Sequence, residues 1–178
     1  LTITAKVNAP GAVDNRAQVV ASVLPDPDSA PGDGAGDDFD SLTLNVIEPT
    51  EVKGTSGRDR LIGTDEADVL IGGRNRDVLT GGDGPDRFVY ENLTDGGDTI
   101  TDFEVGVDRI VLTKVLMALG YDGDNPLADG VITFRTVRGN TLLMLDPDGS
   151  SGRARARSFL LLQNVDESQL SDPSNFVF

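Results

Sequence analysis

Between Gly54 and Val89 the sequence reads GTSGRDRLI, GTDEADVLI, GGRNRDVLT and GGDGPDRFV, four nine-residue units that follow one another without a gap. Each unit begins with glycine and carries aspartate at its sixth position. The eighth position always holds a large apolar residue: Leu61, Leu70, Leu79 or Phe88. Repetition at strict spacing predicts one small structural unit that is used four times and that packs against its own copies.

The composition of the unit indicates what it forms. A glycine-rich turn that ends in a carboxylate, followed by a strand of three residues with one inward side chain, is typical of a parallel β-helix whose loops bind calcium. Calcium takes about six to eight oxygen ligands, more than one short loop supplies. Glycine allows the backbone angles that turn carbonyl oxygens inward. The sequence therefore predicts calcium as the bound ion, held between loops.

The repeats resemble the GGxGxDxUx nonapeptides of the RTX family, whose members leave bacteria through type I secretion. The resemblance covers residues 54–178. The segment GGDTITDFEVGVDRIVL at residues 96–112 is similar to the stretch that follows the repeats in many members. The terminal NFVF, after an acidic lead rich in Ser and Asp, looks like the uncleaved secretion signal of the family. The resemblance implies an extracellular location, on the cell surface or secreted, and a type I transporter as the partner during export.

The resemblance also implies a ligand set. In the RTX β-roll two nonapeptides make one full turn, so that the loops of alternate repeats stack and an ion lies between them. Repeat one pairs with repeat three through Asp59 and Asp77, and repeat two pairs with repeat four through Asp68 and Asp86. Asp98 and Asp108 extend the two columns. Backbone carbonyls of the glycine-rich stretch complete the sites, with these candidates at the first and third positions: Gly54, Ser56, Gly63, Asp65, Gly72, Arg74, Gly81 and Asp83.

The repeats depart from the pattern at several positions. Thr55 and Thr64 replace the second glycine, which we expect to be a mild change. Asn75 at a fourth position tolerates left-handed backbone geometry. Glu66 is the poorest fit at that position and predicts a weak or empty site, so the loops of repeats three and four are expected to bind best.

The predicted fold class is all-β: a parallel, calcium-binding β-roll over 54–112, preceded by a linker at 49–53 and followed by a β-rich cap with the secretion signal at 113–178. Degenerate copies continue the coil, with Asp98 and Ile100, then Asp108 and Ile110, at the sixth and eighth positions. Residues 112–119 read as a short helix that Gly120 ends. Alternating apolar residues predict three strands in the cap, at 130–137, 141–145 and 158–163.

Residues 1–48 resemble the closing part of the DUF11 repeats of bacterial surface proteins. The similar features are an N-x-A-x-V strand from Asn15 to Val19, a DPDS-x-PG loop from Asp26 to Gly32 and a final strand from Leu42 to Val46. The resemblance implies a partial immunoglobulin-like β-sandwich in this segment.

Composition excludes several functional classes. The net charge of -15 makes nucleic acid and anionic membranes improbable partners, and no apolar run has the length of a membrane-spanning helix. The absence of histidine and cysteine removes zinc proteases, Ser-His-Asp hydrolases and thiol enzymes. Because the excess negative charge repels itself in a compact state, and the column of apolar side chains is narrow, we expect the repeats to be disordered until calcium binds.

These observations predict a non-catalytic calcium-binding module at the C-terminal end of a large secreted or adhesin-like surface protein, which folds on calcium after export. Two alternatives stay open. The chain is then either the C-terminal appendage of a secreted enzyme (a protease, lipase or epimerase), or a domain in which residues 110–178 bind a glycan or peptide beside the roll.

Overall fold

The computed structural model describes residues 48–152 and 154–178. The partial immunoglobulin-like sandwich expected over residues 1–48 lies outside this part of the chain, apart from Glu48. In the described residues the fold is rich in strands and poor in helix, as the sequence predicts. None of the described helices has the length and apolar composition needed to cross a membrane.

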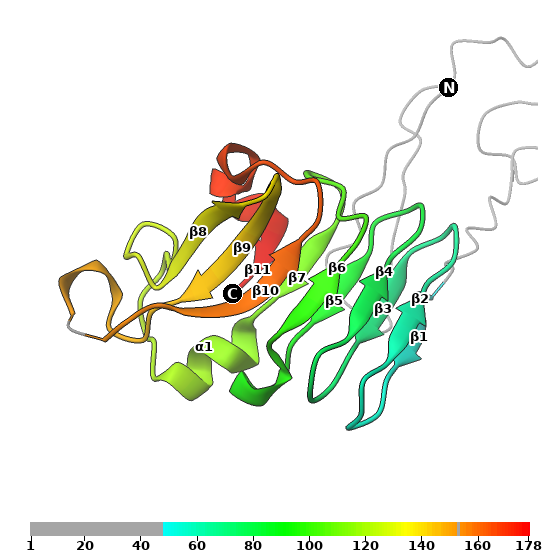
Figure 1. Cartoon of the computed structure of the whole chain (residues 1–178), viewed down its shortest axis with the longest axis horizontal. Helices are drawn as coiled ribbons and strands as arrows, with labels where there is room; N and C mark the ends of the chain where they lie inside the picture. Colours follow the sequence, from blue (N-terminus) through cyan, green and yellow to red (C-terminus); the bar gives the residue numbers. More distant parts are fainter. Residues whose placement is uncertain (1–47, 153) are drawn as a thin grey trace, which may run out of the picture. The chain divides into compact units, whose positions relative to one another are not determined.

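Two sheets contain all strands of the described part (Figure 1). Sheet A has the order β1-β3-β5-β7-β11, with bounds Thr50–Lys53, Asp68–Ile71, Arg87–Val89, Arg109–Val111 and Phe176–Val177. Sheet B has the order β2-β4-β6-β10-β9-β8, with bounds Arg60–Ile62, Val78–Thr80, Asp98–Ile100, Arg157–Leu162, Asn140–Leu145 and Ile132–Val137.

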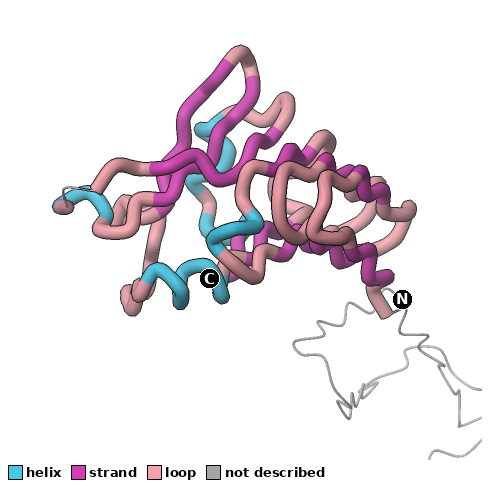
Figure 2. The backbone as a smooth tube through the Cα atoms, turned by 60° about the horizontal axis from the view of Figure 1, so that its bottom comes forward, coloured by secondary structure: helices cyan, strands magenta, loops and turns pink. Residues whose placement is uncertain are grey.

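From β1 to β7 the chain alternates between the two sheets, and every pairing within this segment is parallel. Leu61 pairs in register with Leu79, and Leu70 with Phe88, so strands of alternate repeats lie side by side. Each strand covers the last three or four positions of its nonapeptide. Figure 2 shows the successive turns stacked as a coil, with the loops along its edges.

The linker expected at 49–53 is wrong for most of its length. Thr50–Lys53 forms β1, which pairs in parallel with β3 from Asp68 to Ile71. Val52 packs against the hydrophobic core. Thr50 and Val52 occupy the sixth and eighth positions of a preceding unit without its glycine and aspartate, so the backbone joins the sheet although the sequence signature is missing.

The eighth-position side chains form the core between the sheets, because alternate residues of a strand point to opposite faces. Leu70, Leu79 and Phe88 are fully buried, and Ile100 and Ile110 continue the column. Leu61 is only partly buried because its strand β2 is the edge of sheet B.

The last two turns of the coil contain longer loops without losing register. The 3₁₀ helix η1 (Leu93–Asp95) lies in the loop before β6 and accommodates the extra residues of that interval. Val78 pairs with Thr99, and Leu79 with Ile100, as in the shorter repeats. The continuation of the coil through Asp98 and Asp108 is therefore as the sequence predicts.

After β7 the chain builds a second part on the end of the coil. Helix α1 (Thr113–Leu119) ends at Gly120, which has a φ of 76°, and β8 and β9 form an antiparallel hairpin. β10 then pairs antiparallel with β9 and parallel with β6, so it joins the hairpin to the coil. The other helical turns are η2 (Gly149–Ser151), η3 (Glu167–Ser171) and η4 (Pro173–Asn175).

Two residues of the C-terminal NFVF, Phe176 and Val177, are part of sheet A. β11 pairs in parallel with β7, with Phe176 opposite Ile110. The side chain of Asn175 is completely buried, and its Oδ1 accepts a hydrogen bond of 2.8 Å from Gly106 N. The segment that resembles a secretion signal therefore closes the coil in the folded chain.

We expect Phe88→Ala to be the most damaging single truncation in the coil. Phe88 is fully buried and its ring lies 6.1 Å from that of Phe103. Loss of a buried aromatic side chain costs about 3–5 kcal/mol. Urea unfolding in calcium measures the change, and Ile62→Ala is the matched control because 57% of Ile62 is exposed. Equal effects of the two substitutions would contradict the assigned core.

Candidate metal centre

The sixth-position aspartates lie in two columns, one on each edge of the coil. We call Asp59, Asp77 and Asp98 the odd column, because it begins in repeat one. Asp68, Asp86 and Asp108 form the even column. The pairings predicted from the sequence are the pairings in the structure, since Asp59 contacts Asp77 and Asp68 contacts Asp86.

Each aspartate is bound to the turn before it. From the second aspartate of each column onward, Oδ1 accepts a hydrogen bond from the backbone N–H of the preceding aspartate in the same column. The distances are 2.8 Å for Asp59 to Asp77, 2.8 Å for Asp77 to Asp98, 2.9 Å for Asp68 to Asp86 and 3.0 Å for Asp86 to Asp108. One carboxylate oxygen is thereby fixed in each turn, and its partner oxygen, Oδ2, is left for the loop.

The loops of repeats three and four have left-handed backbone at their second and fourth positions. Gly73, Gly82 and Gly84 have φ values of 89°, 101° and 100°, and Asn75 has 79°. The expectation that Asn75 tolerates this geometry is confirmed. Left-handed residues at alternate positions change the direction of the intervening carbonyl groups, which is the conformation that a loop with several inward oxygens requires.

Carbonyl oxygens of one loop lie against glycines of the next loop in the same column. A Cβ at Gly54 would overlap Gly72 O, and one at Gly82 would overlap Thr64 O. A Cβ at Gly84 would lie 2.8 Å from Glu66 O. The loops are stacked closely enough for oxygens of two turns to share one ligand.

Four carboxylate oxygens in these columns are buried and have no hydrogen-bond partner among the described residues: Asp68 Oδ1, Asp77 Oδ2, Asp86 Oδ2 and Asp98 Oδ2. A Cβ at Gly72 would lie 2.8 Å from Asp77 Oδ2 and 3.0 Å from Asp98 Oδ2, so these oxygens face the glycine backbone of the loop. A buried, unpaired carboxylate oxygen is costly unless a cation or proton compensates it. The residues therefore fit a hard, oxygen-binding cation such as calcium.

Backbone oxygens are required for such a site. In residues 48–152 and 154–178 no three acidic side chains converge on one point as a metal cluster. Carboxylates from two turns and carbonyls from the glycine-rich loops together supply the oxygen set that calcium prefers.

Burial dominates the electrostatics of both columns. It raises the pKa of Asp86 from 3.8 to about 7, against the hydrogen bond from Asp68, and the carboxylate of Asp108 raises it further. Burial likewise raises the pKa of Asp98 to about 7. The pKa of Asp77 is raised for the same reason, although the guanidinium of Arg58 opposes the change.

We expect the calcium-free chain to become more ordered as pH falls from 8 to 5. The pKa values of Asp86 and Asp98 are raised to about 7, so the folded state binds protons that the unfolded state does not bind above its pKa of about 3.8. Stability is therefore gained as pH falls through 7. Far-UV circular dichroism of calcium-stripped protein at the two pH values measures this. A loss of structure on acidification would contradict it.

In repeats one and two a threonine donates hydrogen bonds to one carboxylate oxygen of the aspartate in the same repeat. Thr55 N and Oγ1 donate to Asp59 Oδ2 at 2.6 and 2.8 Å, and Thr64 N and Oγ1 donate to Asp68 Oδ2 at 2.6 and 2.9 Å. The change from glycine to threonine is therefore more than the mild variation expected. It substitutes a hydroxyl donor for left-handed backbone.

The third-position candidates Ser56, Asp65, Arg74 and Asp83 are all exposed, in keeping with a contribution through their carbonyl groups alone. The structure gives one of these carbonyls another partner, since Asn75 Nδ2 donates a hydrogen bond to Ser56 O. Gly63 and Gly81 lie opposite each other in the even column, where a Cβ at Gly63 would overlap Gly81 O.

Three polar residues beside the columns are absent from the sequence prediction. The carboxylate of Asp102 accepts hydrogen bonds from Gly81 N at 2.9 Å and Gly82 N at 3.0 Å. Asp95 is buried and accepts from Asn92 N at 2.8 Å. The hydroxyl of Tyr90 is fully buried beside Asp98. None of them occupies a sixth position, and only the D-x-I-x-D-F spacing marks Asp102.

We expect Gly82→Ala to weaken calcium binding much more than Gly57→Ala. Gly82 has a φ of 101°, and a Cβ there would overlap Thr64 O of the stacked loop. At Gly57 the nearest atom to a Cβ is Thr55 Oγ1 at 3.3 Å, and no positive φ is required. Calorimetric titration of both variants with calcium compares them, and equal affinities would contradict close stacking of the loops.

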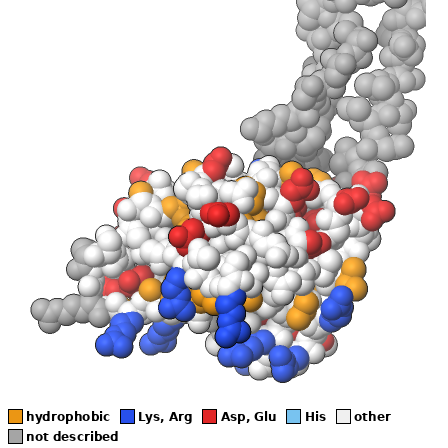
Figure 3. All heavy atoms as spheres, turned by 45° about the horizontal axis from the view of Figure 1, so that its top comes forward, with side chains coloured by type: hydrophobic (Ala, Val, Ile, Leu, Met, Phe, Trp, Pro, Cys, Tyr) orange, Lys and Arg blue, Asp and Glu red, His pale blue; other side chains and the backbone are white. Residues whose placement is uncertain are grey.

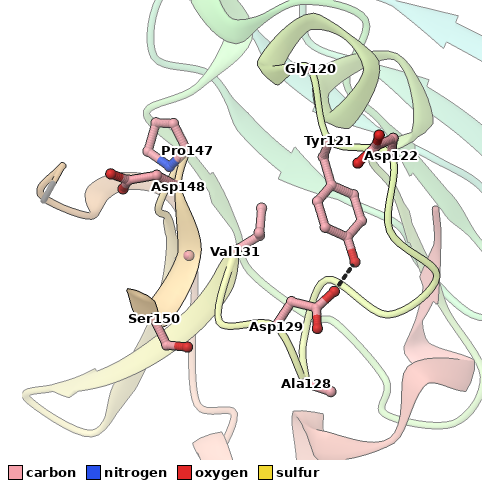
Figure 4. A pocket seen from close by; sticks show the side chains of 10 residues that line it. Gly120, Tyr121, Asp122, Ala128, Asp129, Val131, Pro147, Asp148 and Ser150 are labelled. Atoms are coloured by element: carbon pink, nitrogen blue, oxygen red, sulfur yellow. Dashed lines mark hydrogen bonds between the residues drawn. The ribbon is translucent and has the colours of Figure 1, made fainter. Parts of the chain in front are cut away.

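A separate cavity of about 420 Å³ lies beyond the coil, between the end of α1 and the loop after β9 (Figure 4). Tyr121, Asp129 and Asp148 are among its lining residues. The hydroxyl of Tyr121 donates to Asp129 Oδ2 at 2.5 Å, and the carboxylate of Asp148 accepts from Ala154 N. These polar groups already have partners within the chain.

Comparison with known proteins agrees with the repeat geometry. A family model described as the RTX calcium-binding nonapeptide repeat matches residues 53–88 in four copies. A search of curated proteins returned no match.

Two solved structures similar to this chain are subunits of a mannuronan C5-epimerase from Azotobacter vinelandii. The AlgE6R2 subunit is 22% identical, with a TM-score of 0.48 over 74% of this chain and 92% of that chain. The AlgE6R3 subunit is 24% identical, with a TM-score of 0.44 over 79% of this chain and 86% of that chain. The repeat match and the stacked, oxygen-rich loops lead to one conclusion: this chain carries a block of four RTX nonapeptide repeats, which bind calcium.

Proposed function

We propose that residues 50–112 are a calcium-binding β-roll and that residues 113–178 cap it and carry a type I secretion signal. The observation that supports the roll is the set of buried carboxylate oxygens without partners, at the sixth positions of stacked loops. The candidate ligands are those carboxylates and the first- and third-position carbonyls. RTX repeats are typical of type I secreted proteins. The module itself is non-catalytic and belongs to a larger secreted or adhesin-like surface protein.

Calcium acts as the folding signal in this proposal. Extracellular calcium-binding modules have dissociation constants of about 10⁻⁴–10⁻³ M, far above the calcium concentration inside a cell. The chain then stays unfolded during export and folds outside, where bound ions compensate the buried carboxylates. The terminal NFVF supports this sequence of events, since it would be free for the transporter in the unfolded chain and becomes β11 on folding.

The midpoint of calcium-induced folding tests the proposal. We expect the full chain to fold at about 0.1–1 mM free calcium, as followed by circular dichroism in calcium buffers. Magnesium at the same concentrations is the control, because its stricter octahedral geometry does not suit carbonyl-rich loops. A midpoint below the micromolar range would permit folding inside the cell and would refute the export role.

A further inference from the structure

The exposed charges on the two edges of the coil have opposite signs. The odd-column loops 54–59 and 72–77 carry the exposed residues Arg58, Arg74 and Arg76, and their only acids are the column aspartates. In the third loop of this edge Glu91 pairs with Lys114 at 2.5 Å, and Asp95 is buried. Once calcium compensates the column aspartates, positive charge predominates on this edge.

The even-column loops are acidic. Loops 63–68, 81–86 and 101–108 contain no lysine or arginine, and their exposed acids are Asp65, Glu66, Asp83, Asp102 and Glu104. Figure 3 shows acidic and basic side chains gathered in different regions of one face of the described part. A divalent cation is therefore attracted more strongly to the even edge than to the odd edge.

The availability of carbonyl oxygens differs in the same direction. In the odd column the amide of Asn75 already occupies the carbonyl of Ser56. At the matching positions of the even column stand Gly84 and Asp65, and glycine has no side-chain amide to donate. The carbonyl of Glu66 lies directly against Gly84. A calcium ion in the odd column has to compete with a hydrogen bond that the even column lacks.

We propose that the two columns form two classes of calcium site: the even column binds tightly and fills first, and the odd column fills at higher calcium. This inference rests on the proposed calcium-binding roll and adds its order of assembly. The loops of the two edges differ by several unit charges close to the ion sites. In a screened, water-rich environment this difference corresponds to a calcium affinity roughly tenfold to a hundredfold higher in the even column than in the odd column.

This order differs from the sequence prediction at one loop, that of Glu66, for which the repeat pattern predicts a weak or empty site. Glu66 is the poorest match to the repeat, but its side chain is exposed, and its own φ is not left-handed. Gly84 of the stacked loop supplies the left-handed residue that Glu66 does not. The carboxylate of Glu66 therefore adds attraction for calcium without straining the loop.

Calorimetric titration of the full chain with calcium tests the order. The unmodified chain gives two binding phases. Asp86→Asn removes the tight phase and leaves the weak one, whereas Asp77→Asn removes the weak phase and leaves the tight one. Asparagine keeps an oxygen at Oδ1 for the backbone hydrogen bond, so both variants retain the ladder of the columns. One phase in the unmodified chain, or the reverse assignment, overturns the inference.

Exposed residues provide a second test without altering any carboxylate. The double variant Arg58→Gln and Arg76→Gln tightens the weak phase several-fold and leaves the tight phase unchanged, and Asn75→Gly does the same by freeing Ser56 O. Arg135→Gln, on β8 of the cap, is the control and changes neither phase. Added sodium chloride narrows the gap between the phases through screening. No change in the weak phase in the arginine and Asn75 variants overturns the inference, and absence of any calcium binding refutes the proposed function itself.

Discussion

Withdrawal of calcium with excess chelator is expected to unfold the coil of the full chain, with loss of most of its β signal. At dissociation constants of about 10⁻⁴ M, an ion at about a hundredfold excess contributes about 2.7 kcal/mol to stability. Two such ions together contribute roughly 5 kcal/mol, which equals the lower end of the stability of an ordinary small domain, about 5–15 kcal/mol. Removal also leaves the buried oxygens of Asp68, Asp77, Asp86 and Asp98 uncompensated.

Far-UV circular dichroism in chelator, followed by restoration of millimolar calcium, measures this effect. The signal is expected to return fully, because the chain has no cysteine to misoxidise. Magnesium in place of calcium serves as the control. A chain that keeps its full β signal and a cooperative thermal transition in chelator at pH 8 would rule out ion-dependent folding.

The second large effect is expected from Asp86→Asn, which acts in opposite directions with and without the ion. Without calcium the substitution stabilises the coil, because burial raises the pKa of Asp86 to about 7 and the neutral amide avoids the cost of its charged form. With calcium it destabilises the coil, because the ion loses a charged ligand. We expect calcium affinity at that site to fall by at least about tenfold, the equivalent of about 1.4 kcal/mol.

At pH 8, the residual β signal in chelator measures the first sign by far-UV circular dichroism, and thermal unfolding in calcium measures the second. Asp124→Asn is the control, since Asp124 lies outside the coil and its side chain is exposed. We expect only a small change from this control in either condition. Destabilisation of the Asp86 variant in both conditions would mean that the carboxylate serves the fold and not the ion.

The repetitive part of the fold follows from the sequence because local pattern and tertiary packing agree there. Glycine, aspartate and the eighth-position apolar residue fix where each turn ends and which side chain is buried. The parallel pairing of Leu61 with Leu79 and of Leu70 with Phe88 follows from two units in each turn. The strands stay in register across the longer intervals before Asp98 and Asp108, because the additional residues lie in loops.

The strands at the two ends of the coil could not be predicted from the sequence, because they are held by backbone pairing and not by the residues of the repeat pattern. Thr50–Lys53 has no glycine or aspartate, yet its N–H and C=O groups match the free edge of β3. Phe176 pairs with Ile110 far away in sequence, and no local signal announces that contact. From sequence alone, Thr50–Lys53 resembles a linker and the segment around Phe176 resembles an unstructured tail.

The candidate site was predictable in its carboxylates and not in their surroundings. The columns through Asp59, Asp77 and Asp98, and through Asp68 and Asp86, match the expected pairing. Thr55 donates a hydrogen bond to Asp59, and Asn75 donates one to the carbonyl of Ser56. Both bonds depend on side-chain geometry that a repeat pattern does not encode. Asp102 reaches the loop of repeat four from outside the repeats, across twenty residues.

The hydrogen bond from Asp59 N to Asp77 Oδ1 joins residues 18 apart, and so does that from Asp68 N to Asp86 Oδ1. This spacing gives the coil a parity. Adding or deleting two nonapeptides lengthens or shortens it by a whole revolution and leaves every later strand in its own sheet. A single nonapeptide added to the block before β6 would move every later strand by half a revolution, but β6 and β10, and β7 and β11, would move together and keep their pairings. Duplication can therefore lengthen the coil by any number of repeats without disturbing the cap, and an odd number only rotates the cap to the opposite side of the first turn.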